Sequence, residues 1–574
     1  MKLFKKKQEV YEYPWDKYYK KDERTIVIPN ISIYEYFNKS AFTRGNLVAI
    51  NYFGVTITYT ELEKKINLCA KALISSGVRE NDVVTICMPN TPEAVIMFYA
   101  VNKIGAIANM IHPLSSKEEI KESLIATKSV FLQLINLNFN VVKDVIEDTN
   151  VYKTVVMSPK ESMPPLMGLG YMFLKEMNIN FSSDENFLSW NDFLDRGKSY
   201  TKEVFVHRTE NDPAIYLHSG GTTGTPKNIV LTNGNVNSIN EQAKIIFPDV
   251  GVGDVFLSIL PLFHCFGLIV CVTAPLCLGS TICLIPQFDA KRFDKLIKKY
   301  KPTVIPGVPT LFESLITNPY MINVDLSFIK HFISGGDSLT VAKNEIVNNF
   351  LKEHGSSAHV MQGYGMTETS GPASFGALGS DKLGSVGIPL PGNKIKILNP
   401  DSYDEVAYGE IGEICITGPG VMLEYLNNKE ETDGIMLVAD NGERWVKTGD
   451  LGYMDEDGVI FYVQRLKRML IVSGYNVYPS HLENTIEKCE LVKQCGVIGV
   501  PHPYKVQVPI AYVVLSDKVT DTAEAQIQIR KYCEENLAKY MIPKKIIIKS
   551  EFPKTMVGKI DYKVLEREYK ENNK

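Results

Sequence analysis

The chain carries little net charge and no paired cysteines, and each lack argues against a class of protein. A formal net charge of −4 over 574 residues argues against a nucleic-acid-binding protein that uses a basic face. The 10 cysteines are scattered and none forms a C-x-x-C pair. This pattern predicts reduced, buried thiols in a cytoplasmic protein rather than a disulfide framework. A basic start followed by polar residues, instead of an apolar core, argues against an ordinary secretory signal peptide.

A clean membrane-spanning segment is also lacking. Residues 266–285 are uncharged and long enough to cross a bilayer, but Pro275 and Gly279 interrupt them. Residues 281–285 then have the composition of a strand, so we predict a buried helix followed by a buried strand. The lysines of residues 1–7 could contact an anionic membrane surface. A solvated tail is the favoured interpretation, and peripheral membrane contact stays open.

The length predicts three to four structural units, at about 150 residues for each. Strand and helix signals alternate, as where the apolar residues 83–88 precede a helix start at Thr91 and Pro92. This rhythm predicts an α/β fold with stacked, mostly parallel sheets covered by helices. From about Gly384, short β segments predict a small β-barrel-like part. We expect a large N-terminal domain over residues 1–464 and a small, mobile α+β domain over residues 465–574.

Local signals also place individual elements. Residues 1–45 show little periodicity and are expected to be extended. Thr60 with Glu63 matches a capping box at the start of a helix, and Ser480 with Glu483 matches another.

A glycine-rich loop, residues 219–227, lies between two apolar runs. Its glycines let the backbone approach a ligand, and its hydroxyls and Lys227 add donors suited to a polyphosphate. It is not a Walker loop, because Lys227 follows Pro226 and precedes Asn228. A standard P-loop kinase or GTPase is therefore not expected. A flexible hairpin loop is the structural alternative.

Other segments carry weaker signals of the same kind. In residues 363–369, Tyr364 lies between glycines and could stack on a base, while Glu368 offers the oxygen ligand that Mg²⁺ prefers. Asp450 follows a glycine and could accept hydrogen bonds from ribose hydroxyls. Residues 553–559 end in Lys559. Each segment alone is as often a plain turn.

Taken together and in this order, the segments resemble the adenylate-forming superfamily, which includes acyl-CoA synthetases, adenylation domains of peptide synthetases and firefly luciferase. The resemblance covers nearly the whole chain. Gly220 stands where many members have serine, and Asn228 stands where glycine is usual. The Gly-Gly-Thr-Thr-Gly form occurs in bacterial long-chain fatty acyl-CoA synthetases, so a medium- or long-chain fatty acid is the favoured substrate.

The resemblance implies a role for each matching residue in binding the nucleotide. The loop would hold the β- and γ-phosphates of ATP through Ser219, Gly221, Thr222, Thr223, Gly224 and Lys227. The adenine would lie along Gly336, Asp337 and Ser338 and stack on Tyr364. The ribose would be held by Asp450 and Arg465.

The resemblance also implies the residues of the reaction itself. Thr367 would contact the α-phosphate, Glu368 would bind Mg²⁺, and Lys559 would reach the α-phosphate and the substrate carboxylate. The acyl pocket would include Phe263, His264 and Gly335, with His264 near the acyl carbonyl. Lys467 matches the hinge about which the small domain turns, and Gly474 matches the glycine beside the pantetheine tunnel of coenzyme A.

The implied reaction joins a carboxylic acid to coenzyme A with ATP and Mg²⁺, through an acyl adenylate. The carboxylate is already ionised, so no Ser/His/Asp arrangement is needed. Three alternatives stay open: an aryl-acid CoA ligase, a ligase that loads a carrier protein, and a non-catalytic binding protein on this fold. The non-catalytic alternative is disfavoured, because the chain keeps Lys227, Glu368, Asp450 and Lys559.

Overall fold

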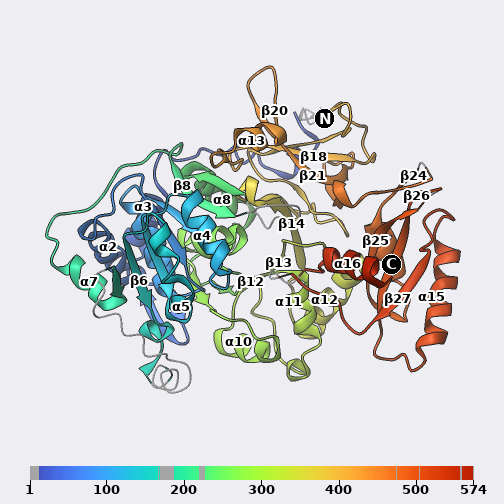
Figure 1. Cartoon of the computed structure of the whole chain (residues 1–574), viewed down its shortest axis with the longest axis horizontal. Coiled ribbons are helices and arrows are strands. Elements are labelled where there is room, and N and C mark those ends of the chain that lie inside the picture. Colours follow the sequence, from blue (N-terminus) through green and yellow to red (C-terminus); the bar gives the residue numbers. More distant parts are fainter. Residues whose placement is uncertain are drawn as a thin grey trace, which may run out of the picture.

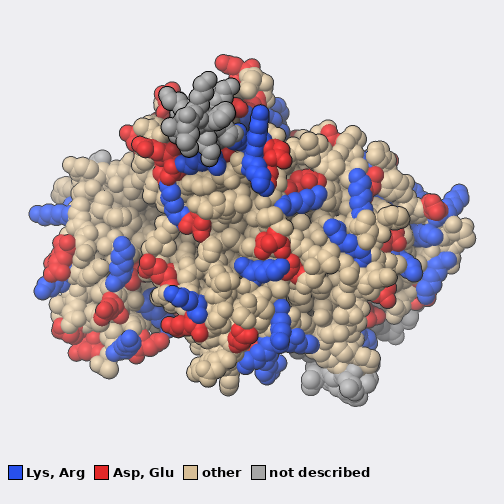
Figure 2. Space-filling view, turned by 180° about the vertical axis from the view of Figure 1, so that it is seen from behind, with Lys and Arg blue, Asp and Glu red and all other residues tan. Residues whose placement is uncertain are grey.

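The structure is a computed structural model that describes residues 12–165, 167, 186–218, 227–473, 475–502, 504–555 and 559–572. A large domain carries three sheets, and a small domain at the C-terminal end carries a fourth (Figure 1). The predicted α/β fold is confirmed. On the face drawn in Figure 2, Lys and Arg side chains are intermingled with Asp and Glu side chains.

Two of the large-domain sheets are mostly parallel. The nine-stranded sheet has the order β16 (Ile388–Pro389), β15 (Gly371–Phe375), β14 (Val360–Met366), β13 (His331–Ser334), β12 (Val304–Gly307), β10 (Val255–Ser258), β11 (Thr281–Leu284), β1 (Val48–Tyr52) and β2 (Val55–Thr58). The eight-stranded sheet has the order β19 (Glu424–Tyr425), β9 (Asn228–Thr232), β8 (Pro213–His218), β4 (Ile107–Met110), β3 (Val83–Cys87), β5 (Phe131–Ile135), β6 (Lys153–Met157) and β7 (Phe187–Ser189).

The other two sheets are mostly antiparallel. The third sheet, where a barrel-like part was predicted, has β17 (Lys394–Leu398), β18 (Gly412–Thr417), β21 (Arg444–Met454) and β20 (Met436–Val438), with β22 (Ile460–Arg465) beside β21. The small-domain sheet has β24 (Tyr475–Val477), β23 (Leu470–Val472), β26 (Val506–Leu515) and β25 (Val492–His502), with β27 (Lys545–Lys549) parallel to β26.

Helices cover the sheets, and one hydrophobic core joins α1, α2, α3 and α8 to strands of the first three sheets. In the large domain they are α1 (Ile33–Arg44), α2 (Tyr59–Ser75), α3 (Pro92–Lys103), α4 (Lys117–Ala126), α5 (Phe139–Val142), α7 (Trp190–Lys198), α8 (Asn233–Ile246), α9 (Ala274–Leu278), α10 (Phe293–Tyr300), α11 (Pro309–Ile316), α12 (Val341–Glu353) and α13 (Lys429–Ile435). In the small domain they are α14 (Pro479–Ile486), α15 (Thr522–Asn536) and α16 (Tyr562–Asn572).

The structure corrects three local predictions. The N-terminal stretch is not all extended, because Ser32 and Glu35 form a capping box that begins α1. The box predicted at Thr60 lies two residues earlier, where Thr58 accepts from the Glu61 N–H. Ser480 does not cap α14, which begins at Pro479. Similar hydroxyl and carboxylate spacings occur nearby, and only the backbone geometry selects among them.

The uncharged stretch 266–285 is buried, as predicted. It forms a π-helix η5 (Phe266–Thr273), then α9 and β11. Pro275 has no N–H for the carbonyl four residues earlier, and Ser258 Oγ donates to that carbonyl, of Cys271, at 2.7 Å. Among the described residues, no helix is both long and apolar enough to cross a membrane. All ten cysteines are buried and free, so the prediction of reduced thiols is confirmed.

Val506 is a strained position in the small domain. It follows the β25–β26 turn with φ +66° and is 60% exposed, and a β-branched residue is unfavourable in that conformation. We expect Val506→Gly to stabilise the small domain by about 1 kcal/mol. Hydrogen exchange of the β25 and β26 amides should slow accordingly. Val438 is a control, because it is 69% exposed on β20 and has no positive φ. Val438→Gly should therefore destabilise its own sheet. Equal effects of the two substitutions would contradict the assignment of backbone strain to Val506.

Candidate active site

Part of the predicted nucleotide site lies at the carboxyl ends of two neighbouring parallel strands. Residues 335–338 follow β13, and Tyr364 lies near the end of β14, which pairs with β13 in parallel. Thr367 and Glu368 form the short 3₁₀ turn η8 (Thr367–Thr369) directly after β14. Ligands of open α/β sheets bind at this edge, so the fold itself brings these segments to one place.

Asp450 is the centre of a buried polar cluster. Tyr364 Oη donates to Asp450 Oδ2 at 2.7 Å, and Arg465 Nε lies 2.9 Å from Asp450 Oδ1. The register of β21 and β22 places Asp450 directly opposite Arg465, which explains the ion pair. Asp450 is 2% exposed, so its carboxylate lies buried between Tyr364 and Arg465.

Lys559, from the small domain, acts electrostatically on this site. Burial raises the pKa of Asp450, and the charges of Arg465 and then Lys559 oppose that shift. Burial and, to a smaller extent, the charge of Lys559 lower the pKa of His264 to about 4. His264 is consequently neutral at pH 7. The backbone holds Lys559 through a bond from the Thr555 N–H to the Lys559 carbonyl at 2.8 Å.

Contacts between the domains accompany this placement of Lys559. Lys343 of α12 lies 2.9 Å from Glu313 of α11 and 3.9 Å from Glu487, which ends α14. The Ser480 N–H donates to the Gln464 side chain at 3.3 Å. Figure 1 shows the small domain beside α11 and α12. Lys467 lies between the domains in the 3₁₀ turn η9 (Leu466–Arg468).

A second cluster joins Lys227 to Glu368 through Tyr425. Tyr425 Oη donates to Glu368 Oε1 at 2.7 Å, and Lys227 Nζ lies 4.7 Å from the centre of the Tyr425 ring. Lys227 Nζ also forms an ion pair with Glu431 at 2.6 Å. The sequence analysis missed Tyr425, since a tyrosine without neighbouring glycines gives no motif signal.

The predicted acyl pocket has an aromatic wall. A Cβ built on Gly335 would lie 2.9 Å from Cε1 of Phe266, so the Phe266 ring fills the space beside this glycine. Space beside Gly335 therefore depends on Phe266, which the sequence analysis did not select. Phe263 packs against His112, with ring centroids 4.2 Å apart. The Phe266 N–H donates to His264 Nδ1 at 3.3 Å.

Thr367 lies beside the acyl-pocket segment, since its Oγ1 is 3.6 Å from Cys265 Sγ. Asp337 accepts at 2.9 Å from the N–H of Ser338, and Gly336 has φ +77°. Some predicted residues lie outside the described residues, namely Ser219, Gly221, Thr222, Thr223, Gly224 and Gly474.

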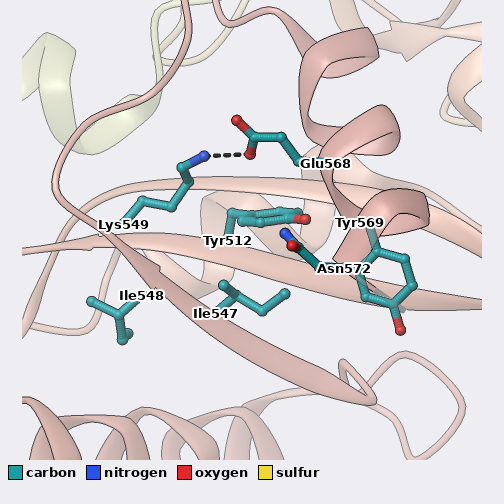
Figure 3. Close-up of a pocket in the computed structure, with 7 residues that line it drawn as sticks. All are labelled: Tyr512, Ile547, Ile548, Lys549, Glu568, Tyr569 and Asn572. Carbon is teal, nitrogen blue, oxygen red and sulfur yellow. Dashed lines mark hydrogen bonds and ion pairs between the residues drawn. The ribbon is translucent and has the colours of Figure 1, made fainter. Parts of the chain in front are cut away.

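The small domain also contains a hollow of about 180 Å³ that none of the predicted residues lines. Figure 3 shows the Lys549–Glu568 ion pair on one side and Tyr512, Tyr569 and Ile547 around it. It is separate from the clusters around Asp450 and Glu368.

Comparison with known proteins identifies the family. Residues 37–426 match the family described as AMP-binding enzyme, and residues 481–559 match the AMP-binding enzyme C-terminal domain. The chain belongs to the AMP-binding enzyme family. The resemblance drawn from the motifs is thereby confirmed.

Curated relatives extend over almost the whole chain. A long-chain-fatty-acid–CoA ligase of Bacillus subtilis (strain 168) is 31% identical over 98% of this chain and 99% of its own length. The 4-coumarate–CoA ligase CCL1 of Humulus lupulus is 29% identical over 94% of each chain. The ATP-bound crystal structure of MatB from Rhodopseudomonas palustris, 24% identical, covers 95% of this chain and all of its own, with a TM-score of 0.82. The predicted function, an adenylate-forming acyl-CoA ligase that uses ATP and coenzyme A, is confirmed at this level.

Proposed function

We propose that this AMP-binding enzyme converts a long-chain fatty acid to its CoA thioester in the cytoplasm, with AMP and pyrophosphate as products. The observation that carries the reaction is the buried cluster of Tyr364, Asp450 and Arg465, on whose carboxylate the charge of the small-domain Lys559 also acts. The apolar segment η5 and the long-chain-acid ligase among the relatives support the substrate class. Ten free, buried thiols fit a reducing compartment.

We assign ATP to the edge formed by β13 and β14. The adenine lies along residues 336–338 against Tyr364, and a ribose hydroxyl donates to the Asp450 carboxylate, which Arg465 holds in place. The loop 219–227 holds the β- and γ-phosphates. Thr367 and Lys559 then face the α-phosphate, where negative charge builds up during attack by the carboxylate.

Glu368 fits a magnesium ligand, although the described residues contain no cluster of three or more metal-binding side chains. Magnesium commonly binds one or two carboxylates together with substrate phosphates and water, so a single buried carboxylate is sufficient. Bound there, the ion would neutralise phosphate charge. Glu368 is 7% exposed and is oriented by Tyr425.

The first half-reaction needs no general base. The ionised carboxylate of the acid attacks the α-phosphorus, the bond to the bridging oxygen breaks, and pyrophosphate leaves. Neutral His264 lies beside the acyl pocket, where it can hydrogen-bond the acyl carbonyl without repelling Lys559. The CoA thiolate then attacks that carbonyl carbon and AMP leaves.

We also propose that the chain divides into domains at residues 464 and 465 and that the small domain turns about Lys467 between the half-reactions. The strand β22 ends at Arg465, one residue past this boundary, and β23 begins the small-domain sheet at Leu470. The turn would remove Lys559 and present the face that carries Gly474 to coenzyme A. Lys467 in η9 lies between these two strands.

The direct test is a panel of carboxylic acids scored for AMP formation with and without coenzyme A. With long-chain acids, a fatty-acid ligase should release AMP over many turnovers only when coenzyme A is present in excess over the enzyme. An aryl-acid ligase is the second candidate, favoured by the 4-coumarate–CoA ligase among the relatives. A flat response from butyrate to palmitate, with high activity on a hydroxylated aryl acid, would favour that candidate.

The Phe266–Gly335 contact predicts how acid length is limited. Each methylene buried in the pocket should raise kcat/KM about three- to fourfold until the passage is full. Gly335→Leu should press on the Phe266 ring and lower kcat/KM for palmitate about 100-fold, while short acids and the KM for ATP change little. Adding Phe266→Ala should restore long acids, because it vacates the space. Unchanged length preference in both variants would contradict this assignment.

A further inference from the structure

We propose that Tyr425 is a positioning residue that orients Lys227 and Glu368 together, so that one side chain positions both the phosphate-binding lysine and the magnesium ligand. This inference rests on the proposed function, which gives Lys227 to the β- and γ-phosphates and Glu368 to the metal. The structure brings both groups to the same tyrosine, on opposite parts of it. The hydroxyl contacts Glu368 and the ring face contacts Lys227.

The backbone around Tyr425 is tied to the segments it serves. Tyr425 lies in β19, where it pairs with Ile229 of β9, two residues after Lys227. The Met422 N–H donates to the Glu368 carbonyl at 2.8 Å, and Ser370 Oγ donates to the Gly420 carbonyl at 2.8 Å. The segment 420–425 is thus fixed both to the strand after the phosphate loop and to η8.

The same segment is also supported from helices. Asn235 of α8 donates to the carbonyls of Pro419 and Val421 at 2.8 and 2.9 Å. The Tyr425 N–H donates to Thr432 Oγ1 of α13 at 3.0 Å. Tyr425 is 4% exposed, so its ring cannot swing away without disrupting the core. Its position is therefore set before any nucleotide binds.

The chemistry of the two contacts suits this role. A phenol hydroxyl that donates to a carboxylate is a strong, directional hydrogen bond, and it fixes the plane of Glu368 through Oε1. The face of an aromatic ring attracts an ammonium group, so the Tyr425 ring attracts Lys227 in addition to its ion pair with Glu431. Burial raises the pKa of Tyr425, which keeps the hydroxyl protonated as a donor.

Two substitutions separate the two contacts. Tyr425→Phe keeps the ring under Lys227 but removes the donor to Glu368, whereas Tyr425→Leu removes both. Tyr59→Phe is the matched control, because Tyr59 is fully buried and its hydroxyl donates to carbonyls of Leu276 and Ser280, away from the site. Each variant is compared with the full-length wild type for ATP binding by calorimetry, with Mg²⁺ or with EDTA.

In the wild type, Mg²⁺ should increase the affinity for ATP over that measured in EDTA. We expect this increase to be about tenfold or more smaller in Tyr425→Phe, while its affinity for ATP in EDTA stays unchanged. Tyr425→Leu should weaken ATP binding in EDTA as well. Pyrophosphate exchange should fall in both variants, and the half-saturating Mg²⁺ concentration should rise about tenfold in Tyr425→Phe. Thioester formation from a synthetic acyl adenylate should be preserved.

The inference is overturned if Tyr425→Phe binds ATP with the full Mg²⁺ increment, or if Tyr59→Phe shows the same loss. An equal decrease in the rates of both half-reactions would likewise contradict the inference, because it would show that Tyr425 only supports the fold. A wild-type enzyme that shows no acid-dependent pyrophosphate exchange would instead refute the proposed function, so the two failures are distinguishable.

Discussion

Lys559→Ala should lower acid-dependent pyrophosphate exchange by about 10²–10³-fold, the cost of removing one group that stabilises transition-state charge. Lys559 is the small-domain cation that acts on Asp450 and His264. It can assist attack on the α-phosphate only while the domain lies in this orientation. Once the adenylate exists, the lysine has no further part in the chemistry. Thioester formation from synthetic acyl adenylate and CoA should therefore stay near the wild-type rate.

Lys554→Ala is the matched control for this variant. Lys554 is exposed on the same hairpin and pairs with Ile560 across it, so a general loss of the hairpin would affect both variants equally. If Lys559→Ala slowed both half-reactions together while its thermal stability matched the wild type, the assignment to adenylation would be wrong.

Lys467→Pro should produce the converse result. The helical backbone of η9 suits the fixed φ of proline, so the orientation seen here is retained. The change of φ and ψ needed for the small domain to turn would be blocked, since hinges concentrate that change in one or two residues. Acyl adenylate should accumulate on the enzyme, and steady-state thioester synthesis should fall by about 10²-fold or more.

The measurement is single-turnover product analysis with labelled ATP, which separates bound adenylate from released AMP. Lys467→Ala is the control, because it removes the same side chain but leaves the backbone free to turn. Normal thioester synthesis by Lys467→Pro would exclude Lys467 as the hinge. A loss shared with Lys467→Ala would assign the effect to the lysine side chain instead.

Several elements could be predicted because their signals are local. The N-cap threonine and the following proline of α3 fix that start at Thr91 and Pro92, as the structure confirms. The start of α2 was harder to predict, since Thr58 and Thr60 both precede a glutamate by three residues. Only Thr58, the last residue of β2, has the extended backbone of an N-cap. The helix α1 was missed because its buried side includes tyrosines and a serine, which weakens an apolar pattern.

Motif order predicted the family, because the glycine-rich loop, Glu368, Asp450 and Lys559 occur in an order that resembles that of its members, and the family match confirmed it. The contacts that join those residues depended on tertiary structure alone. Tyr425 contacts Glu368 although 57 positions of the chain separate them. Phe266 likewise fills the space beside Gly335, which lies far from it in the sequence. Sequence spacing encodes neighbours within a turn or a strand, whereas such packing partners are selected by how sheets, helices and domains come together.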